Sequence, residues 1–581
     1  MRHLILLFAL ISVLAGGCNA MKLTIEGTSD YQIVLPVQAS PSERHAAQEL
    51  QSFLEQASGA RLPIVDETAP LKEHEIILGN NAHLKELGLV INWDKLGKEG
   101  FTIKTRGGRL IIAGGAQRGT MYGVYTFLED YLGFRWFTSK ITRAPHLPTI
   151  SLPAHLDDTQ VPVLEYREPF FTEAFDADWA ARNKVNGQSM RLDEERGGKI
   201  TYFPFVHTFA NLVPPEKYFK EHPEYFSLVD GQRQDGYAQL CLTNPDVRRI
   251  ALEGVRQWMK EHPEAGIYSV SQNDTFRNCQ CDNCRALDEA QGSPMGSLLD
   301  FVNYIAGELA DEFPDKAIDT LAYQYTRKAP KNLRPLPNVI IRLCSIECCF
   351  SHPLATCDSS ENTNFRRDME EWARVSDRTY IWDYNTDFAN YWLPFPNYWV
   401  LQPNIKYFVE HGVKGIFEEG AYPPGGGGEG AELKSYIMAK ALWDPDYDAD
   451  VAINEFCEGV YGAAAPLMLE YLHMMADSVK DYHMHIWEGV NAPYLTPELI
   501  SKADELFQRM LEVTERDEVA RAEVEKAWVP ILYVRCAQMG KGHPDFLPLA
   551  KQLFAIVDAN GFGQWREGNP TENLRNDWLG Q

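Results

Sequence analysis

The stretch Val339-Ile340-Ile341-Arg342-Leu343-Cys344 is an almost uninterrupted apolar run. Such a run is typical of a parallel strand, because helices cover both sides of a parallel sheet and leave its strands buried on two faces. Seven further segments have strand character, and segments of helical periodicity separate them. The eight predicted strands are residues 161–171, 199–209, 238–242, 266–274, 317–326, 339–347, 379–387 and 412–420.

Eight strand–helix alternations over residues 161–443 match a (β/α)8 TIM barrel, a fold that needs about 250 residues. The sequence is therefore of the α/β class, with a barrel as its central domain. Residues 22–153 are expected to form a small α/β support domain, with a helix over residues 43–56 and a hairpin that turns at Arg106-Gly107-Gly108. Residues 445–581 have mainly helical periodicity and no strand pattern.

The composition excludes some classes of partner. The chain has 581 residues, and 81 Asp and Glu against 55 Lys and Arg give a formal net charge of −26. A balance this acidic argues against binding to nucleic acid or to an anionic membrane through bulk charge. Aromatic residues make up 12% of the chain, a content that suits stacking against sugars as well as a large core.

Residues 1–20 predict the compartment. A basic start, a short apolar run over residues 4–14 and small residues are typical of a secretory signal peptide, which is too short to span a membrane. Ala15-Gly16-Gly17-Cys18 is similar to a bacterial lipobox, in which Cys18 would be lipidated, and cleavage after Ala20 is the alternative. We expect an extracytoplasmic protein, periplasmic or on the cell surface, that touches the membrane only through a lipid anchor.

Polar side chains gather at the ends of the predicted strands, where a TIM barrel carries its active site. Asn273 and Asp274 end a buried strand, which favours a functional role for both. Side-chain alternation sends only one of Glu418 and Glu419 inward, and we expect it to be Glu418. Each group has an ordinary structural alternative, such as capping a helix or pairing with an Arg. The candidates are His207, Gln272, Asn273, Asp274, Glu347, Asp383, Asp387, Glu418 and Glu419.

These residue types favour the hydrolysis of a glycosidic bond. That reaction needs an acid to protonate the leaving oxygen and a second group to attack or stabilise the anomeric carbon. The aromatic run around Trp382 and Tyr384 could stack on sugars past the strand end, although core packing explains part of it. The chain has no G-x-S-x-G, H-E-x-x-H or G-x-x-x-x-G-K motif, so serine hydrolase, metalloprotease and P-loop chemistry are not indicated. We expect no cofactor.

Eleven cysteines raise a separate question. Cys279, Cys281 and Cys284 have C-x-C-x-x-C spacing directly after Asp274. In a secreted chain disulfides or buried thiols are the first expectation. A structural metal site built with cysteines from residues 344–357 is the alternative, because thiolates suit zinc. We expect the cysteines to shape the loop and predict no metal in the active site.

Several segments resemble glycoside hydrolase family 163, formerly a domain of unknown function from gut Bacteroidetes. The most specific is SVSQNDTFRNCQCDNCRALDEAQGSPMGSLLDFVNYIA, residues 269–306. Residues 205–209, 222–226 and 239–245 are similar to the family as well. RGTMYGVYTFLEDYLGFRWF, residues 118–137, resembles the domain that precedes the barrel in α-glucuronidases and β-hexosaminidases. Together the resemblances cover roughly residues 25 to 440.

The resemblance implies an endo-β-N-acetylglucosaminidase that cuts the chitobiose core of complex N-glycans, with an N-glycan or glycoprotein as its partner. In related hydrolases the 2-acetamido oxygen of the sugar attacks the anomeric carbon. On that basis we expect Asn273 to orient the acetamido group and Asp274 to be the acid/base. A neutral Asn stabilises a developing oxazolinium less than a carboxylate does, so Glu418 or Asp383 could share the work. His207, Gln272, Glu347, Trp382, Asp383, Tyr384 and Glu419 are expected to bind substrate.

Two other functions stay open. One is an inverting α-glucuronidase-like exo-enzyme with Asp383 and Glu418 as bases, for which Arg277 and Arg342 would have to form the uronate subsite. The other is a surface glycan-binding lipoprotein whose barrel has lost activity. The number of carboxylates at the strand ends argues against the second.

Overall fold

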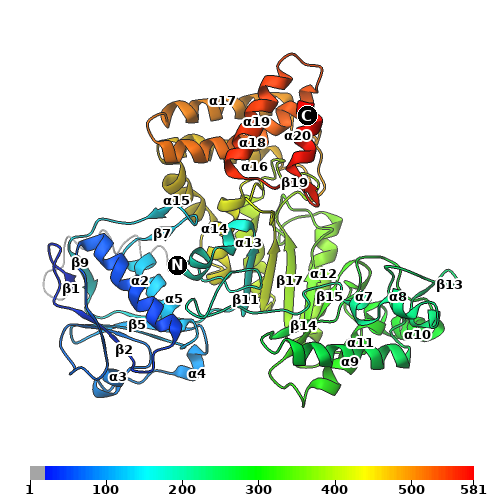
Figure 1. Ribbon diagram of the computed structural model, residues 1–581, viewed down its shortest axis with the longest axis horizontal. Helices are drawn as coiled ribbons and strands as arrows, with labels where there is room; N and C mark the ends of the chain where they lie inside the picture. Colours follow the sequence, from blue (N-terminus) through cyan, green and yellow to red (C-terminus); the bar gives the residue numbers. More distant parts are fainter. Residues whose placement is uncertain (1–19, 581) are drawn as a thin grey trace.

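The computed structural model describes residues 20–580, and it consists of an N-terminal α/β unit, a central parallel sheet with its helices, and a helical C-terminal region (Figure 1). The residues of the predicted signal segment and Cys18 lie outside the described range, apart from Ala20. Within residues 20–580 no helix is long and apolar enough to cross a membrane.

The N-terminal unit is a six-stranded mixed sheet, and helices α2 and α5 lie together on one side of it (Figure 1). Helix α2 begins with a capping box, in which the Ser40 hydroxyl and the Glu43 carboxylate each accept a backbone N–H. The hairpin expected at residues 106–108 is formed by β5 and β6. The elements in sheet order are β10 (Asp157–Gln160), β5 (Phe101–Arg106), β6 (Arg109–Gly114), β4 (Glu75–Leu78), β2 (Gln32–Leu35) and β3 (Ile64–Asp66), with α2 (Pro41–Ser58) and α5 (Gly119–Thr126).

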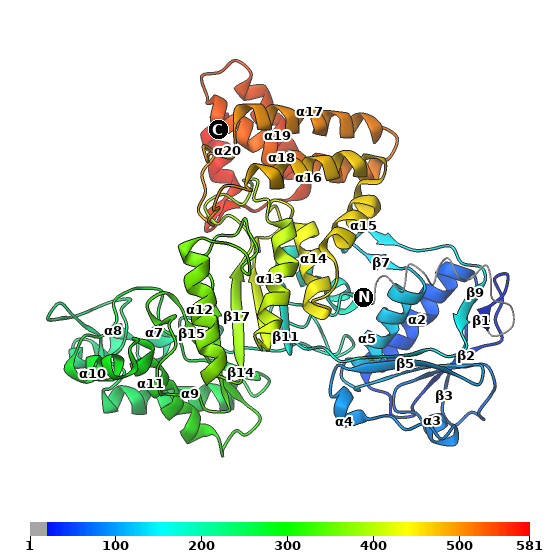
Figure 2. The same cartoon turned by 180° about the vertical axis from the view of Figure 1, so that it is seen from behind.

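The central sheet is curled, and its six strands are all parallel. Every residue of β16 is buried, as the apolar run predicts. Helices surround the sheet on its outer side (Figure 2). The strands in sheet order are β11 (Tyr166–Phe170), β18 (Gly415–Glu419), β17 (Thr379–Tyr384), β16 (Val339–Cys344), β15 (Ala317–Ala322) and β14 (Ile267–Ser269). The main helices are α9 (Pro245–Glu261), α11 (Met295–Leu309), α12 (Ser360–Val375), α13 (Tyr398–Glu410) and α14 (Ala431–Trp443).

Two of the eight predicted strands differ in the structure. Residues 199–209 run beside β14, but only Tyr202 forms a regular parallel bridge, to Ile267. Pro204 has no N–H, which interrupts a ladder at that point. Residues 238–242 do not join the parallel sheet, and Leu240 there makes an antiparallel bridge to Phe226.

The C-terminal region is a stack of helices above the sheet, as its periodicity predicts (Figures 1 and 2). The one departure from that prediction is a two-stranded hairpin. Its strands are β19 (Gln564–Arg566) and β20 (Asn569–Pro570), and its turn carries Glu567. The helices are α15 (Ala449–Tyr461), α16 (Ala465–Ser478), α17 (Pro497–Val513), α18 (Glu518–Met539), α19 (Phe546–Asn560) and α20 (Thr571–Leu579).

Candidate active site

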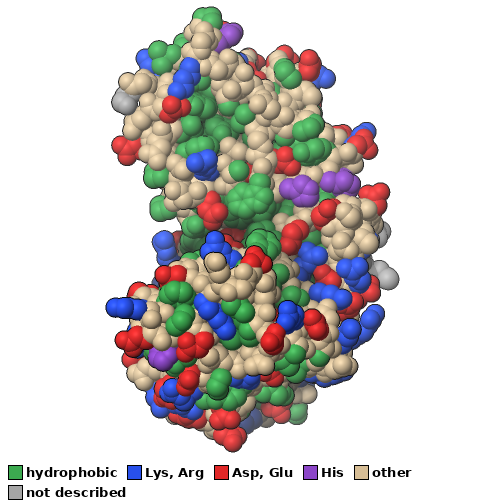
Figure 3. Space-filling model, turned by 90° about the vertical axis from the view of Figure 1, so that its right-hand side faces the viewer, with side chains coloured by type: hydrophobic (Ala, Val, Ile, Leu, Met, Phe, Trp, Pro, Cys, Tyr) green, Lys and Arg blue, Asp and Glu red, His purple; other side chains and the backbone are tan. Residues whose placement is uncertain are grey.

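A cavity of about 330 Å³ lies at the carboxyl ends of the parallel strands. Alternate residues of each strand face it, because successive side chains of a strand point to opposite faces. The strands contribute Leu321, Cys344, Trp382, Tyr384 and Glu419, and the residues just past β15 and β16 contribute Tyr323 and Ile346. Loops complete the wall with Val206, His207, Asp274, Phe388, Ile486, Trp487 and Glu567. Figure 3 shows the side of the molecule that carries α9, α11 and the C-terminal helices, where the surface narrows between two lobes and hydrophobic and acidic side chains gather.

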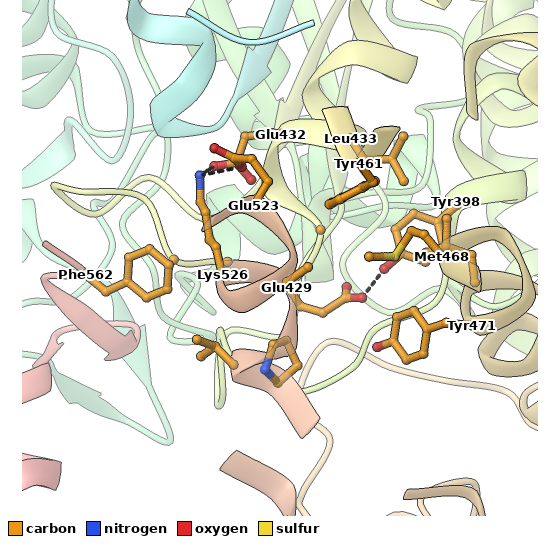
Figure 4. Close-up of a pocket in the computed structure, with 17 residues that line it drawn as sticks. Tyr398, Glu429, Glu432, Leu433, Tyr461, Met468, Tyr471, Glu523, Lys526 and Phe562 are labelled. Atoms are coloured by element: carbon orange, nitrogen blue, oxygen red, sulfur yellow. Dashed lines mark hydrogen bonds and ion pairs between the residues drawn. The ribbon is translucent and has the colours of Figure 1, made fainter. Parts of the chain in front are cut away.

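Other cavities are less suited to catalysis. Hollows of about 810 and 910 Å³ lie near the amino ends of the strands or against the N-terminal unit, whereas parallel α/β sheets bind their ligands at the carboxyl ends. A cavity of about 40 Å³ lies between α14 and the C-terminal helices (Figure 4). The polar groups that line it already have protein partners. Lys526 forms an ion pair with Glu432, and the Tyr398 hydroxyl donates a hydrogen bond to Glu429.

Asp274 lies on the cavity wall, as predicted for a site residue. The Tyr323 hydroxyl donates to its Oδ1 at 3.2 Å, so the carboxyl is held as a hydrogen-bond acceptor. Burial and the nearby Asp274 carboxylate raise the pKa of Tyr323, which keeps the phenol protonated and able to donate. His207 lies on the same wall. Its Nδ1 donates to the Gln272 carbonyl at 2.7 Å, and this bond fixes the orientation of the ring.

Asn273 and Gln272 do not reach the cavity. The Asn273 amide donates to the Ala238 carbonyl at 2.6 Å and accepts the Ala210 N–H at 3.2 Å. The Gln272 amide donates to the Tyr323 carbonyl and accepts the Thr326 hydroxyl. Both side chains are buried and occupied by protein groups, so they hold the Asp274 loop in place.

Glu419 faces the cavity. Trp382 Nε1 donates to its Oε2 at 2.7 Å. Burial raises the pKa of Glu419 to about 8, although the hydrogen bond from Trp382 lowers it in part. The carboxyl therefore keeps its proton at neutral pH and is available as an acid. Tyr384 is the register partner of Glu419 and lines the same wall.

Glu418 and Asp383 lie on the other face of the sheet, where they are register partners and both buried. The expectation that Glu418 points inward is corrected: alternation along β18 turns its neighbour to the cavity. Asn385 Nδ2 donates to Glu418 at 2.5 Å and Ser345 donates to Asp383. Burial and then the Asp383 charge raise the pKa of Glu418 well above its usual range, and burial raises that of Asp383 to about 6.

Two further candidates serve ion pairs. The Glu347 carboxylate forms an ion pair with Arg327 at 2.8 Å, and Glu347 does not line the cavity. Arg342, a candidate for a uronate subsite, makes a bidentate ion pair with Asp319 at 2.7 and 3.0 Å. Its guanidinium is buried under Phe205 and Trp382, at 4.5 and 5.3 Å from the ring centres. It therefore lies in the floor, below the space that a substrate would enter.

Tyr323, Trp487 and Glu567 also line the cavity, and the sequence pattern did not identify them as site residues. Tyr323 follows β15 directly and had a strand-end position that could have been noticed. Trp487 is 57% exposed and Glu567 lies in the C-terminal hairpin, both far from the strands in sequence. Backbone hydrogen bonds hold the segments of Trp487 and Glu567 in place. The Phe388 N–H donates to the Ile486 carbonyl, and the Glu567 N–H donates to the Phe388 carbonyl. Burial and the Asp274 charge both raise the pKa of Glu567.

Residues 136–473 match the family described as "Domain of unknown function (DUF4838)", and this range is more than half of the chain. The chain belongs to this family. Residues 25–127 of this DUF4838 protein match the family described as "Glycosyl hydrolase family 67 N-terminus". A search of curated proteins found no match. The assignment to glycoside hydrolase family 163 stays a prediction.

Solved structures similar to the DUF4838 protein carry glycosidase names. The family GH115 4-O-methyl-α-glucuronidase BtGH115A aligns with a TM-score of 0.58 and 13% identity, over 96% of this chain and 78% of its own. CpGH84D aligns with a TM-score of 0.49 and 10% sequence identity, over 93% of this chain and 90% of its own. A Streptomyces plicatus β-hexosaminidase mutant aligns with a TM-score of 0.42 and 12% sequence identity, over 76% of this chain and 91% of its own. At 13% identity, the similarity to BtGH115A supports a shared fold.

Proposed function

We propose that this DUF4838 protein is a glycoside hydrolase, and specifically an endo-β-N-acetylglucosaminidase that acts on complex N-glycans. The observation that carries the proposal is that two carboxyl groups, those of Asp274 and Glu419, line one cavity at the carboxyl ends of the strands. Most glycoside hydrolases cleave the bond with two carboxyl groups that flank it. The aromatic walls supplied by Trp382, Tyr384 and Trp487 suit sugar faces. The match to a glycosyl hydrolase family 67 N-terminus supports the same class.

The positions of the side chains suggest how the work is divided. Glu419 would protonate the leaving oxygen, because its raised pKa keeps it in the acid form. Asp274, held by Tyr323, would accept the N–H of the 2-acetamido group while the acetamido oxygen attacks the anomeric carbon. In this assignment Asp274 takes the orienting role expected of Asn273, whose amide is turned to the backbone. A carboxylate also stabilises the oxazolinium charge better than an amide.

The α-glucuronidase-like alternative fits the cavity less well. A uronate needs a cationic partner, and among the described residues that line the cavity His207 is the only basic side chain. The bases expected for that reaction, Asp383 and Glu418, lie on the opposite face of the sheet.

A complex N-glycan labelled at its reducing end tests the proposal. The endo-enzyme should release labelled N-acetylglucosamine and an unlabelled, shortened glycan. Release of unlabelled monosaccharide alone would indicate an exo-enzyme. Binding of the glycan with no product would indicate a glycan-binding protein, and either result would overturn the proposal.

A further inference from the structure

Two groups of Cys and His side chains lie outside the cavity, on loops that lead to its wall. One consists of Cys349, His352, Cys357 and His483, and the other of Cys241, Cys279, Cys281 and Cys284. In each group all four ligand atoms lie within 4.8 Å of one another. All ten cysteines within the described residues are free thiols. Each group thus offers the four ligands of a closed, tetrahedral metal site.

The distances in the first group match a tetrahedral zinc site. With sulfur at about 2.3 Å and nitrogen at about 2.0 Å from zinc, a sulfur and a nitrogen ligand lie about 3.5 Å apart. Cys349 Sγ is 3.3 Å from Nδ1 of both His352 and His483, and Cys357 Sγ is 3.8 Å from Nδ1 of His483. Both rings therefore present the same nitrogen to one point.

The surroundings of His352 fix its Nδ1 as the ligand nitrogen. His352 Nε2 donates to the Lys480 carbonyl at 2.9 Å, so the ring proton is on Nε2 and Nδ1 is left with its lone pair. His483 Nε2 is 3.6 Å from Asp358 Oδ1. The Lys480 carbonyl on the far nitrogen of His352 is the kind of partner that orients a metal-binding imidazole and increases its basicity.

We propose that the first group binds a structural zinc ion that fastens the loop over residues 348–357 to the segment before Trp487. Two Cys thiolates and two neutral His ligands make a closed set with no position left for water, which is the pattern of structural zinc. His483 is three residues from Ile486, and Ile486 and Trp487 line the cavity. The ion therefore fixes the part of the C-terminal region that completes the cavity wall.

The second group carries a separate inference, because its observations are independent. Cys241 Sγ and Cys281 Sγ are 3.6 Å apart, near the spacing of about 3.8 Å for sulfurs on one zinc ion and far beyond the bond of about 2.0 Å in a disulfide. Leu228 N–H donates to Cys279 Sγ at 3.4 Å, and Arg233 Nη1 is 3.9 Å from the same sulfur. Such donors offset the negative charge of four thiolates.

We infer that the four cysteines bind a second structural zinc ion, which holds the loop that carries Asp274. Cys241 follows Gln239, whose amide donates to the Asn273 and Thr275 carbonyls at 2.7 Å. Cys279 lies five residues after Asp274. The ion would thus close the loop on both sides of the catalytic aspartate. Thiolate ligands that are bound to zinc also resist disulfide formation in an oxidising compartment.

Metal analysis of the purified full chain tests both sites. The wild-type protein should contain two zinc ions per chain, and zinc-edge X-ray absorption should give an average of three sulfur and one nitrogen ligand. His483→Ala should contain one ion with four sulfur ligands, and Cys281→Ser should contain one ion with two sulfurs and two nitrogens. The matched controls His485→Ala and Cys536→Ala should each retain two.

Several results would overturn these assignments. Wild-type protein grown with zinc that contains no zinc, or contains iron instead, would remove both sites. Disulfide-linked peptides of Cys279, Cys281 or Cys284 in a non-reducing digest would remove the second. If a variant does not fold, hydrogen exchange is measured on the wild-type protein before and after chelation of zinc. Loss of the first ion should lower the protection of residues 348–357 and 480–487. Loss of the second should lower that of residues 237–241 and 275–284. Unchanged protection after zinc removal would contradict the fastening role.

Discussion

Glu418 and Glu419 are consecutive residues of β18, and their carboxyl groups lie on opposite faces of the parallel sheet. Glu419 faces the cavity and accepts a hydrogen bond from Trp382. Glu418 is 1% exposed on the other face, beside its register partner Asp383. Both carboxyls have raised pKa values, but only one of them can meet a substrate. The pair is therefore an internal control for any experiment on the reaction.

Glu419→Gln should lower kcat/KM by about 10²-fold or more, because the general acid is lost while the acceptor for Trp382 Nε1 is kept. Glu418→Gln should leave kcat/KM within about threefold of wild type, since the amide can still accept from Asn385. Steady-state kinetics on the reducing-end-labelled N-glycan measures both, because its leaving group is a sugar hydroxyl that needs protonation. A large loss in Glu418→Gln with normal Glu419→Gln would reverse the assignment.

The activity should depend on pH through Glu419. The acid must be protonated, so kcat/KM should be retained below the pKa of about 8 and fall as pH rises through it. The hydrogen bond from Trp382 lowers that pKa, so Trp382→Phe should move the alkaline limb to higher pH. An alkaline limb near the ordinary pKa of Glu, 4.5, would exclude Glu419 as the acid.

Tyr323→Phe should weaken catalysis through Asp274. The substitution removes the donor to Asp274 Oδ1, and a hydrogen bond to a charged group is worth about 1.5–3 kcal/mol, or roughly 10- to 100-fold in rate. Asp274→Asn should cost at least as much. Tyr237→Phe is the control, because its hydroxyl meets only the Asp274 backbone N–H, at 3.3 Å. Equal losses in Tyr323→Phe and Tyr237→Phe would show that loop position, not the carboxylate contact, matters.

Trp487→Ala should raise KM several-fold and change kcat little. The side chain is 57% exposed at the cavity, so it is available to stack on a sugar away from the bond that breaks. Trp487→Phe should recover part of the affinity, because the aromatic face is kept. A loss confined to kcat would instead place the indole near the reacting centre.

The sequence pattern predicts the sheet best where burial alone decides the strand. Residues 339–344 form a strand buried at every position, as an apolar run demands. Residues 238–242 have a similar apolar character, but Gln239 bonds the Asn273 backbone and Cys241 joins the cysteine group, so the segment is held outside the sheet. Local pattern carries no information on such contacts between distant loops.

The candidate site was predictable only in part, for a related reason. Alternation requires Glu418 and Glu419 to point to opposite faces, yet which one faces inward depends on the register with β17, a relation between strands. Asp274, His207, Trp382, Tyr384 and Glu419 line the cavity, and the sequence analysis names all five as candidates. Trp487 and Glu567 reach the cavity through backbone bonds around Phe388, and nothing near them in sequence indicates this.

Fluorinated substrates test the proposed use of the acetamido group. In substrate assistance the nucleophile is the acetamido oxygen, so mono-, di- and trifluoroacetamido substrates should react progressively more slowly as electron density is withdrawn. Asp274→Asn should flatten this dependence, because an acetamido group without its partner rarely reaches the in-line geometry that positioning supplies. Glu419→Gln should slow every member of the series and keep its slope, since protonation of the leaving oxygen is a separate role. An equal rate across the series in the wild-type enzyme would contradict substrate assistance. The attacking group would then have to be a carboxylate of the cavity or a water molecule that it activates, with Asp274 and Glu567 as the candidates that line the cavity.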